Sequence, residues 1–336
     1  MRIGAIDTDE KILIVAEIGN NHEGSFTTAV RMVQEVARTG ADAVKFQTFR
    51  TEHYVNPIQN ERFQRLKSFE LTFPQFADLG RIAHEEGLLF ISTPFDLLSA
   101  RFLGEFADAI KISSSDNTFF PLIREAVLTG KPLLMSTGLA SVAEIRPAVA
   151  IIQNDRKSQA DFALLHCVCS YPAAEGSLNL IQIRRLQDEF HCVVGYSDHS
   201  LGVEASVVAV GAGARIVEKH FTLNKNFSDF RDHKLSADPS EMSQLVNRIR
   251  QTERMLGSHE TEVSSEELPI KKQLRRSIVA ARKLDSGHLI EADDISWTRP
   301  GEGIAPGNEP MVVGRRLKRA LETGEMISLD SLESNL

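Results

Sequence analysis

Short apolar runs alternate with longer amphipathic stretches along the first 257 residues of the chain. The first run, 12–16, is followed by a helical pattern over 25–39 that ends before Gly40. A short continuous apolar run predicts a buried strand, and apolar positions three and four residues apart predict a helix packed on one side. Strands that alternate with helices in this way predict a parallel sheet.

Eight strands are predicted, at 12–16, 43–46, 88–91, 109–112, 132–135, 162–165, 192–194 and 215–217. Helices are predicted at 25–39, 73–86, 121–128, 142–152, 180–189, 203–210 and 240–256, with a long irregular stretch after the second strand. Eight units over ~245 residues are typical of a (β/α)₈ TIM barrel. A doubly wound open sheet is the alternative, but 17–21 lacks the Gly-rich turn that usually follows its first strand.

The pattern changes after residue 257. The stretch 258–275 begins polar and acidic and is predicted to be a linker, while 276–336 has short apolar runs broken by Gly and Pro. A domain of about 60 residues buries only a marginal core. We therefore expect a barrel over 1–257 and a small second domain over 276–336 that leans on a neighbour.

Composition excludes several classes of function. The formal net charge is −8, a poor match for nucleic acid or an anionic membrane. No apolar run approaches the ~18 residues of a membrane span. Three cysteines are too few for a disulfide framework, and a single Cys-x-Cys pair (Cys167 and Cys169) is weak evidence for zinc. The sequence predicts a soluble cytoplasmic protein with reduced thiols.

Polar side chains gather where the predicted strands end, and in a parallel barrel these ends meet at one face. Lys45 and Gln47 share a face of the second strand, and Lys111 lies on the fourth. An unpaired ammonium is costly to bury, so two lysines among hydroxyl side chains predict a strongly anionic ligand. Two alternatives stay open: ion pairs of the lysines with Glu17 and Asp116, and a Schiff-base lysine.

Two histidines, His199 and His220, follow the seventh and eighth strands. Consecutive strand ends are neighbours in a barrel, so both imidazoles are placed to bind one cation. Packing histidines that only form hydrogen bonds are the alternative. We expect Glu218 or Asp198 to orient one of the imidazoles.

In this order and spacing the segments resemble the sialic acid synthase family, over nearly the whole chain. The segments are AEIGNNHEG at 16–24, KFQT at 45–48, ISTPFD at 91–96, KISS at 111–114, STG at 136–138, LHC at 165–167, YSDH at 196–199 and EKHFT at 218–222. The sequence TRPG at 298–301 resembles the antifreeze-like (SAF) domain that follows the barrel in this family. The resemblance implies that phosphoenolpyruvate condenses with an N-acylated amino hexose, releasing phosphate and a nonulosonic (sialic-type) acid.

The resemblance also implies roles for single residues. Those implied to hold phosphoenolpyruvate are Lys45, Thr93, Lys111, Ser114, Ser136 and Ser197. Those implied to contact the sugar are Gln47, Asp116, Tyr171, Asp232 and Arg299, the last from the second subunit of a domain-swapped homodimer. Glu17 is implied to move protons, and His199 and His220 to bind a catalytic divalent metal, Mn²⁺ in the first place, with Mg²⁺ and Co²⁺ as alternatives.

Two positions depart from the family pattern. Cys169 stands where Asn or Ser is expected near phosphoenolpyruvate, and Phe230-Arg231 replaces a Gly-Pro pair in the sugar loop. The acceptor is therefore either N-acetylmannosamine or a related sugar, such as a deoxygenated diamino hexose or a phosphorylated sugar. A loop that merely repacks is the alternative explanation of the Phe230-Arg231 pair. An octulosonate-type synthase and a non-catalytic sugar-binding scaffold are the remaining alternatives.

Overall fold

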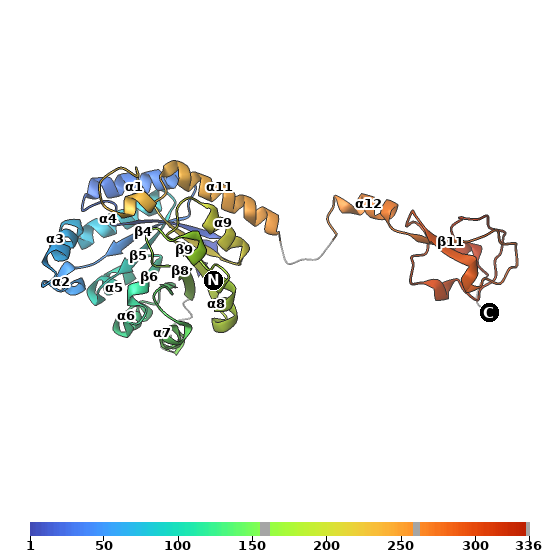
Figure 1. Ribbon diagram of the computed structural model, residues 1–336, viewed down its shortest axis with the longest axis horizontal. Helices are drawn as coiled ribbons and strands as arrows, with labels where there is room; N and C mark the ends of the chain where they lie inside the picture. The colour runs from blue at the N-terminus through green and yellow to red at the C-terminus, as the bar shows by residue number, and fades with distance from the viewer. Residues whose placement is uncertain (155–161, 258–262, 334–336) are drawn as a thin grey trace. The chain divides into compact units, whose positions relative to one another are not determined.

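The computed structural model describes residues 1–154, 162–257 and 263–333, and the chain divides into two compact units, 1–257 and 258–336. The first unit is a closed barrel with the strand order β10-β3-β4-β5-β6-β7-β8-β9, and helices surround it (Figure 1). Strand β10 pairs in parallel with β3, which closes the ring. The predicted TIM barrel is confirmed, and the open sheet is excluded.

The barrel strands agree closely with the predicted runs. They are β3 (Leu13–Gly19), β4 (Ala43–Thr48), β5 (Leu89–Pro94), β6 (Ala109–Ile112), β7 (Leu133–Ser136), β8 (Phe162–Cys167), β9 (Val193–Asp198) and β10 (Ile216–His220). Most extend beyond the apolar run into polar residues, because the alternation of inward and outward side chains continues to the strand end.

The helices of this unit include four that the sequence pattern did not reveal. The helices are α1 (Phe26–Thr39), α2 (Thr51–Tyr54), α3 (Asn60–Phe69), α4 (Phe73–Glu85), α5 (Leu97–Gly104), α6 (Phe120–Leu128), α7 (Val142–Asn154), α8 (Gln182–Phe190), α9 (Glu204–Gly211), α10 (Asp232–Leu235) and α11 (Pro239–Leu256). The four are α2, α3, α5 and α10. Helices α2 and α3 occupy the stretch predicted to be irregular, so that prediction is wrong. Helix α3 buries none of its residues fully, and its apolar side chains, Phe63, Leu66 and Phe69, are only half-buried.

Local signals set the ends of the longer helices. Ser25 Oγ accepts from Thr28 N at 3.2 Å before α1, and Gly40, with φ of 83°, ends that helix. Asp238 and Glu241 form a reciprocal capping box around the start of α11. These caps hold the outer helices against the strands that carry the site.

The barrel interior is apolar at one end and polar at the other. A buried cluster inside the barrel includes Leu13, Val15 and Ala43, and Ile3 from the hairpin of β1 (Arg2–Ile3) and β2 (Ile6–Asp7) joins it. Side chains alternate along a strand, so Glu17 faces the same way as Val15, and Lys45 faces the same way as Ala43. The apolar cluster therefore supports a layer of polar side chains at the C-terminal strand ends.

The second unit is small and has its own buried core. Strands β11 (Ser277–Ala280) and β12 (Ile295–Thr298) pair antiparallel, and α12 (Glu267–Leu274) lies within the stretch predicted to be a linker. The core contains Ile278, Leu284, Ile290, Val312, Leu317, Leu321 and Ile327. No helix in the described part of the chain is long and apolar enough to cross a membrane.

Candidate active site

A buried cluster of two carboxylates and one lysine joins β3, β4 and β10. Lys45 Nζ lies 2.9 Å from Glu17 Oε2 and 3.5 Å from Glu218 Oε1, and it donates to Thr93 Oγ1 at 3.2 Å. Glu218 Oε1 also accepts from Ser197 Oγ at 3.0 Å. Lys45 thus forms the ion pair with Glu17 that the sequence left open, and Glu218 is a second carboxylate in the same cluster.

The two carboxyl groups of this cluster have opposite pKa shifts. Burial raises the pKa of Glu17, against the attraction of Lys45. Burial also acts to raise the pKa of Glu218, but Lys45 and Lys111 together lower that pKa to about 2. Burial acts to lower the pKa of Lys45, but both carboxylates counter this and raise it. The cluster therefore combines a carboxyl that can hold a proton with one that stays ionised, an arrangement typical of acid–base sites.

The second buried lysine has no such compensation. Lys111 on β6 donates to Ser136 Oγ and, at 3.0 Å, to Ile112 O, and it forms no ion pair among the described residues. Asp116 accepts instead from Ser113 Oγ at 2.7 Å and Ser115 Oγ at 2.9 Å, so the alternative pairing of Lys111 with Asp116 is wrong. Burial lowers the pKa of Lys111. This ammonium group is placed to receive an anionic ligand.

Hydroxyl groups surround the two lysines. Ser114 Oγ, in the 3₁₀ turn Ser114–Asp116, accepts from Gly138 N at 3.1 Å. A Cβ atom on Gly138 would lie 2.7 Å from that oxygen, so only glycine allows the approach. The structure brings the following predicted phosphoenolpyruvate ligands to the strand-end layer as buried side chains: Lys45, Thr93, Lys111, Ser136 and Ser197.

The two histidines meet beside this layer. The ring centroids of His199 and His220 are 5.6 Å apart, and His199 Nδ1 lies 2.8 Å from Val168 O. His220 Nδ1 is buried and has no hydrogen-bond partner among the described residues. Burial, and then the proximity of His199, hold the pKa of His220 well below its ordinary value. Neutral imidazole is the form that binds metal.

These features fit a divalent cation, although the protein does not enclose one by itself. Among the described residues, no group of three or more His, Cys, Asp or Glu side chains is arranged to hold a metal. Two imidazoles with open positions suit Mn²⁺, which also takes oxygen ligands from water and substrate, better than a closed zinc site. His199 and His220 are therefore the residues that would hold the ion.

One prediction about the histidines is wrong. Asp198 does not orient His199, because neighbouring residues on a strand face opposite sides. Asp198 Oδ2 accepts from Lys219 Nζ at 3.0 Å on the outer face of the barrel sheet, and the carbonyl of Val168 holds His199 instead. The charged cluster of Asp198 and Lys219 is a buried structural pair outside the site.

The residues predicted to contact the sugar surround the histidines at the mouth of the barrel. Gln47 Nε2 donates to Glu17 Oε1 at 3.2 Å. The Tyr171 ring lies 4.3 Å from the His199 ring, and the guanidinium of Arg231 lies 5.1 Å from the centre of the Tyr171 ring. Arg231 also donates to Asp232 Oδ1 at 3.2 Å. Tyr171 and Asp232 thus lie near His199, Gln47 lies beside Glu17, and Asp116 lies in the turn after β6.

A buried network that the sequence analysis missed holds the loop around Asp232. His233 Nε2 lies 2.9 Å from Glu23 Oε1, and His233 Nδ1 lies 2.7 Å from Thr222 Oγ1. Ser228 Oγ donates to the same Glu23 oxygen. Glu23 and His233 are 210 residues apart, so their contact cannot be seen in the sequence. The only signal was that both residues lie in polar segments that follow β3 and β10.

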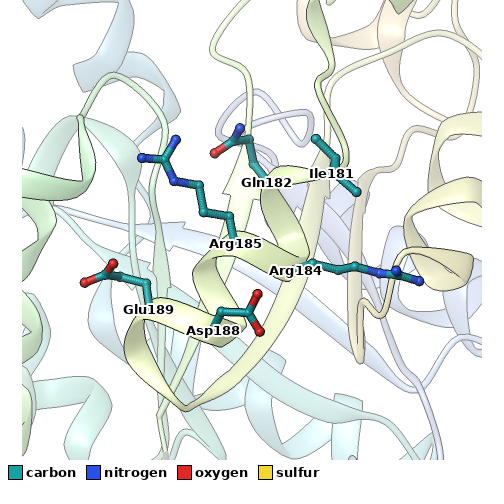
Figure 2. Close-up of a pocket in the computed structure, with 6 residues that line it drawn as sticks. All are labelled: Ile181, Gln182, Arg184, Arg185, Asp188 and Glu189. Carbon is teal, nitrogen blue, oxygen red and sulfur yellow. The ribbon is translucent and has the colours of Figure 1, made fainter.

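Arg299 lies in the second unit, is exposed and follows β12. Its predicted role in the barrel of another subunit remains a prediction. The surface hollow in Figure 2, of about 510 Å³, lies along α8 and is lined by Gln182, Arg184, Arg185 and other residues of that segment. None of the predicted site residues lines it, so we place the site by its side chains at the strand ends.

Comparisons with known proteins identify the family of the chain. The profile of the NeuB family matches residues 32–261, and that of the SAF domain matches residues 275–333. The chain therefore belongs to the NeuB family and carries a C-terminal SAF domain.

Three proteins are similar to this chain over most of its length. An uncharacterized protein of Methanocaldococcus jannaschii is 41% identical, over 96% of this chain and 95% of its own length. The N,N'-diacetyllegionaminic acid synthase of Legionella pneumophila is 38% identical, over 96% and 94%. The crystal structure of an N-acetylneuraminic acid (sialic acid) synthetase from Leptospira borgpetersenii, in complex with citrate, is 34% identical with a TM-score of 0.75, over 80% of this chain and 94% of that one.

Proposed function

We propose that this protein condenses phosphoenolpyruvate with the open-chain aldehyde of an N-acylated amino hexose and water, giving a nonulosonic acid and phosphate. The observation that carries the proposal is the environment of Lys111. This buried lysine donates to one hydroxyl and one backbone carbonyl and forms no ion pair with a carboxylate among the described residues, whereas Lys45 is already paired. Membership of the NeuB family supports the same reaction.

The charge of phosphoenolpyruvate matches this arrangement. The molecule carries nearly three negative charges, and Lys111 is the cation placed to compensate them. Serine hydroxyls at 114, 136 and 197 and the threonine hydroxyl at 93 supply donors that fix the orientation of the phosphate and carboxylate groups. Binding in a site closed to water strengthens each of these contacts.

Glu17 is the proposed proton carrier. The enol carbon of phosphoenolpyruvate attacks the aldehyde carbon, water adds at the phosphate-bearing carbon, and the carbon–oxygen bond to phosphate breaks. Each step needs proton transfer close to the new bond. Glu17 is buried, has a raised pKa and hydrogen bonds to Gln47, a proposed sugar contact.

A divalent metal held by His199 and His220 would polarise the aldehyde oxygen and lower the pKa of a bound water. His199 is held in position by Val168 O, and the Tyr171 ring covers its face. This leaves His199 Nε2, and His220 Nδ1, which has no hydrogen-bond partner among the described residues, as nitrogens that could bind the ion.

We further propose that the acceptor carries two N-acyl groups. The Legionella relative is named for an N,N'-diacetylated product. In this chain Phe230 packs edge-to-face on Phe69 at 5.3 Å, which makes the rim beside Asp232 more apolar than a fully hydroxylated sugar requires. An acylamino, deoxygenated hexose fits such a rim better than N-acetylmannosamine.

The active unit is proposed to be a domain-swapped homodimer in which Arg299 of a second subunit binds an acyl group of the sugar. Leu139 and Leu201, on the loops after β7 and β9, are 75% and 60% exposed at the mouth of the barrel. Apolar side chains exposed at a substrate entrance support a partner that covers it.

The test is phosphate release from phosphoenolpyruvate by the purified chain with Mn²⁺ and a panel of acceptors. The panel contains a 2,4-diacetamido-trideoxy hexose, N-acetylmannosamine, its 6-phosphate and arabinose 5-phosphate. We expect release with the diacetamido sugar, loss of release with a chelator, and a ~10²–10⁴-fold lower rate for Glu17→Gln.

Other outcomes would change the assignment. Release with N-acetylmannosamine alone would keep the reaction and overturn the proposed sugar. Release with arabinose 5-phosphate alone would make the protein an octulosonate-type synthase. A metal-loaded protein that binds phosphoenolpyruvate and releases no phosphate with any acceptor would be a sugar-binding scaffold.

A further inference from the structure

Two cysteines lie side by side in the proposed phosphoenolpyruvate site. Cys167 is the last residue of β8, and Cys169 follows it by two positions. A Cβ atom on Gly138 would lie 2.8 Å from Cys167 Sγ and 2.6 Å from Cys169 Sγ, so both sulfurs are turned toward one point. Cys167 Sγ also lies 3.0 Å from Ser114 Oγ.

The two thiols are chemically different. The hydrogen bond with Cys167 lowers the pKa of the Cys169 thiol to about 6, against the effect of burial, and Lys111 lowers it further. The same hydrogen bond, with burial, raises the pKa of Cys167 well above its ordinary value. Cys169 is half-buried and Cys167 is buried. An accessible thiolate beside a protonated thiol is the arrangement of a redox-sensitive pair.

We infer that Cys167 and Cys169 form a reversible disulfide when the protein meets a hydroperoxide, and that this modification shuts down the site. In the first step the Cys169 sulfur attacks the peroxide oxygen, which gives a sulfenic acid and releases water or an alcohol. In the second step the Cys167 sulfur attacks the sulfenic sulfur and water leaves. The protein loses two hydrogens, the peroxide takes up two electrons, and a dithiol reverses the reaction.

The geometry permits this bond without a large rearrangement. Residues two apart on an extended chain have Cα atoms ~6.6 Å apart, near the upper end of the ~4.4–6.8 Å that a disulfide spans. The chain leaves the strand after Cys167, which brings both sulfurs to the same side of Gly138. A disulfide near this geometric limit is readily reduced, as a reversible modification requires.

The residue between the cysteines links the disulfide to the metal site. The carbonyl of Val168 lies 2.8 Å from His199 Nδ1, and Tyr171, just beyond Cys169, covers the His199 ring. A bond between the two sulfurs closes a small ring around Val168 and must turn its peptide groups. The His199 imidazole then loses its fixed orientation, so oxidation weakens metal binding as well as the contact of Cys167 with Ser114.

The test compares the reduced and the peroxide-treated full-length protein. We expect peptide mass spectrometry to show the loss of two hydrogens on the segment with both cysteines. We expect the Mn²⁺ dissociation constant to rise about tenfold or more, the range of effects seen when a partner that orients a metal ligand is lost. Dithiothreitol should reverse both changes.

Variants keep the test specific. Cys167→Ser and Cys169→Ser should both abolish the peroxide-induced change in Mn²⁺ affinity. Cys192→Ser is the matched control and should respond like the unmodified protein, because Cys192 precedes β9 at the other end of the barrel strands. Circular dichroism establishes that each variant is folded before it is compared.

Two results would overturn the inference: irreversible oxidation of Cys169 with no bond to Cys167, or a disulfide that leaves Mn²⁺ affinity unchanged. The inference rests on the proposed function for its effects on turnover and on Mn²⁺ binding, whereas the disulfide itself does not depend on it. The mass and metal-binding measurements do not depend on the sugar, so a failure of the synthase assay remains distinguishable from a failure of the disulfide.

Discussion

The two lysines of the polar layer lie in different electrostatic environments. On the side of β3, β4 and β10, Lys45 lies between Glu17 and Glu218, and its charge is balanced within the protein. On the side of β6 and β7, Lys111 donates to Ser136 and the backbone and forms no ion pair among the described residues, although Glu218 and Cys169 lie near enough to interact with its charge. Burial lowers the pKa of Lys111, whereas the carboxylates raise that of Lys45.

This difference separates two tasks that one site must perform. A balanced cluster can move protons without binding a foreign charge, because every change within it is compensated nearby. An unbalanced ammonium destabilises the free protein and is relieved when an anion arrives. We therefore assign proton transfer to the half with carboxylates and anion binding to the half with hydroxyls.

The largest effect is expected from removing each lysine in turn. Lys111→Met should reduce kcat/KM for phosphoenolpyruvate by ~10²–10³-fold, the range for loss of one electrostatic contact in a site. It should leave stability unchanged or higher, because a cation with a lowered pKa opposes folding at neutral pH. Lys45→Met should cost ~3–5 kcal/mol, because it leaves two carboxylates buried without a cation.

Steady-state kinetics and urea unfolding of the two variants measure these effects. Equal losses of stability in Lys45→Met and Lys111→Met would contradict the division of the layer into a balanced and an unbalanced half. The result would then favour two structural lysines.

The next effect concerns the histidines between the halves. His220→Ala should weaken Mn²⁺ binding by more than ~100-fold, since it removes one of only two protein ligands. Isothermal titration with Mn²⁺ measures this. His84→Ala, at an exposed position on α4, is the control and should bind Mn²⁺ as the unmodified protein does. An unchanged affinity in His220→Ala would place the metal elsewhere.

A smaller effect is expected from pH. The pKa of Glu218, about 2 in the folded protein, is below its ordinary value of 4.5. Its contribution to stability is therefore present above pH 4.5 and is lost as the pH falls toward 2. Glu218→Gln should flatten the fall in the free energy of unfolding over this window, while Glu61→Gln, on the exposed surface of α3, should not.

The smallest effect is expected at the rim. Arg231 interacts with the Tyr171 ring and with Asp232, and an exposed contact of this kind is worth ~0.5–1 kcal/mol. Arg231→Ala should therefore raise the KM for the sugar ~2–5-fold and leave the KM for phosphoenolpyruvate unchanged. A larger change in the second constant would show that the rim and the anion site are coupled.

The sequence was most informative where alternation along a strand governs the side chains. Glu17, Lys45 and Ser197 follow apolar runs, and their inward direction follows from counting by two. The same rule, applied to Asp198, shows why its predicted role was wrong: as the neighbour of His199 it faces the opposite side. The TIM barrel was predictable because eight such runs recur at regular intervals.

Other features depend on contacts that no local pattern carries. Helix α3 is mostly polar and buries no residue fully, so its three apolar residues, Phe63, Leu66 and Phe69, give only a weak periodic signal. Glu23 and His233 meet beyond the ends of β3 and β10, which become neighbours only when the barrel closes, and their distance along the chain hides the contact. The pairing of Lys45 with two carboxylates instead of one also depends on the closure of β10 onto β3.

The hairpin of β1 and β2 restricts where molecules can enter and leave the barrel. Ile3, fully buried, packs against Leu13 and Val15 and stops the N-terminal end of the interior. An entering molecule therefore reaches the polar layer from the C-terminal strand ends, an opening at which Tyr171 and Arg231 are exposed while Lys111 is buried. Under the proposed function, a sugar seated at the opening blocks the path to the lysines. Phosphoenolpyruvate must enter first, and the sugar acid must leave before the next molecule can pass.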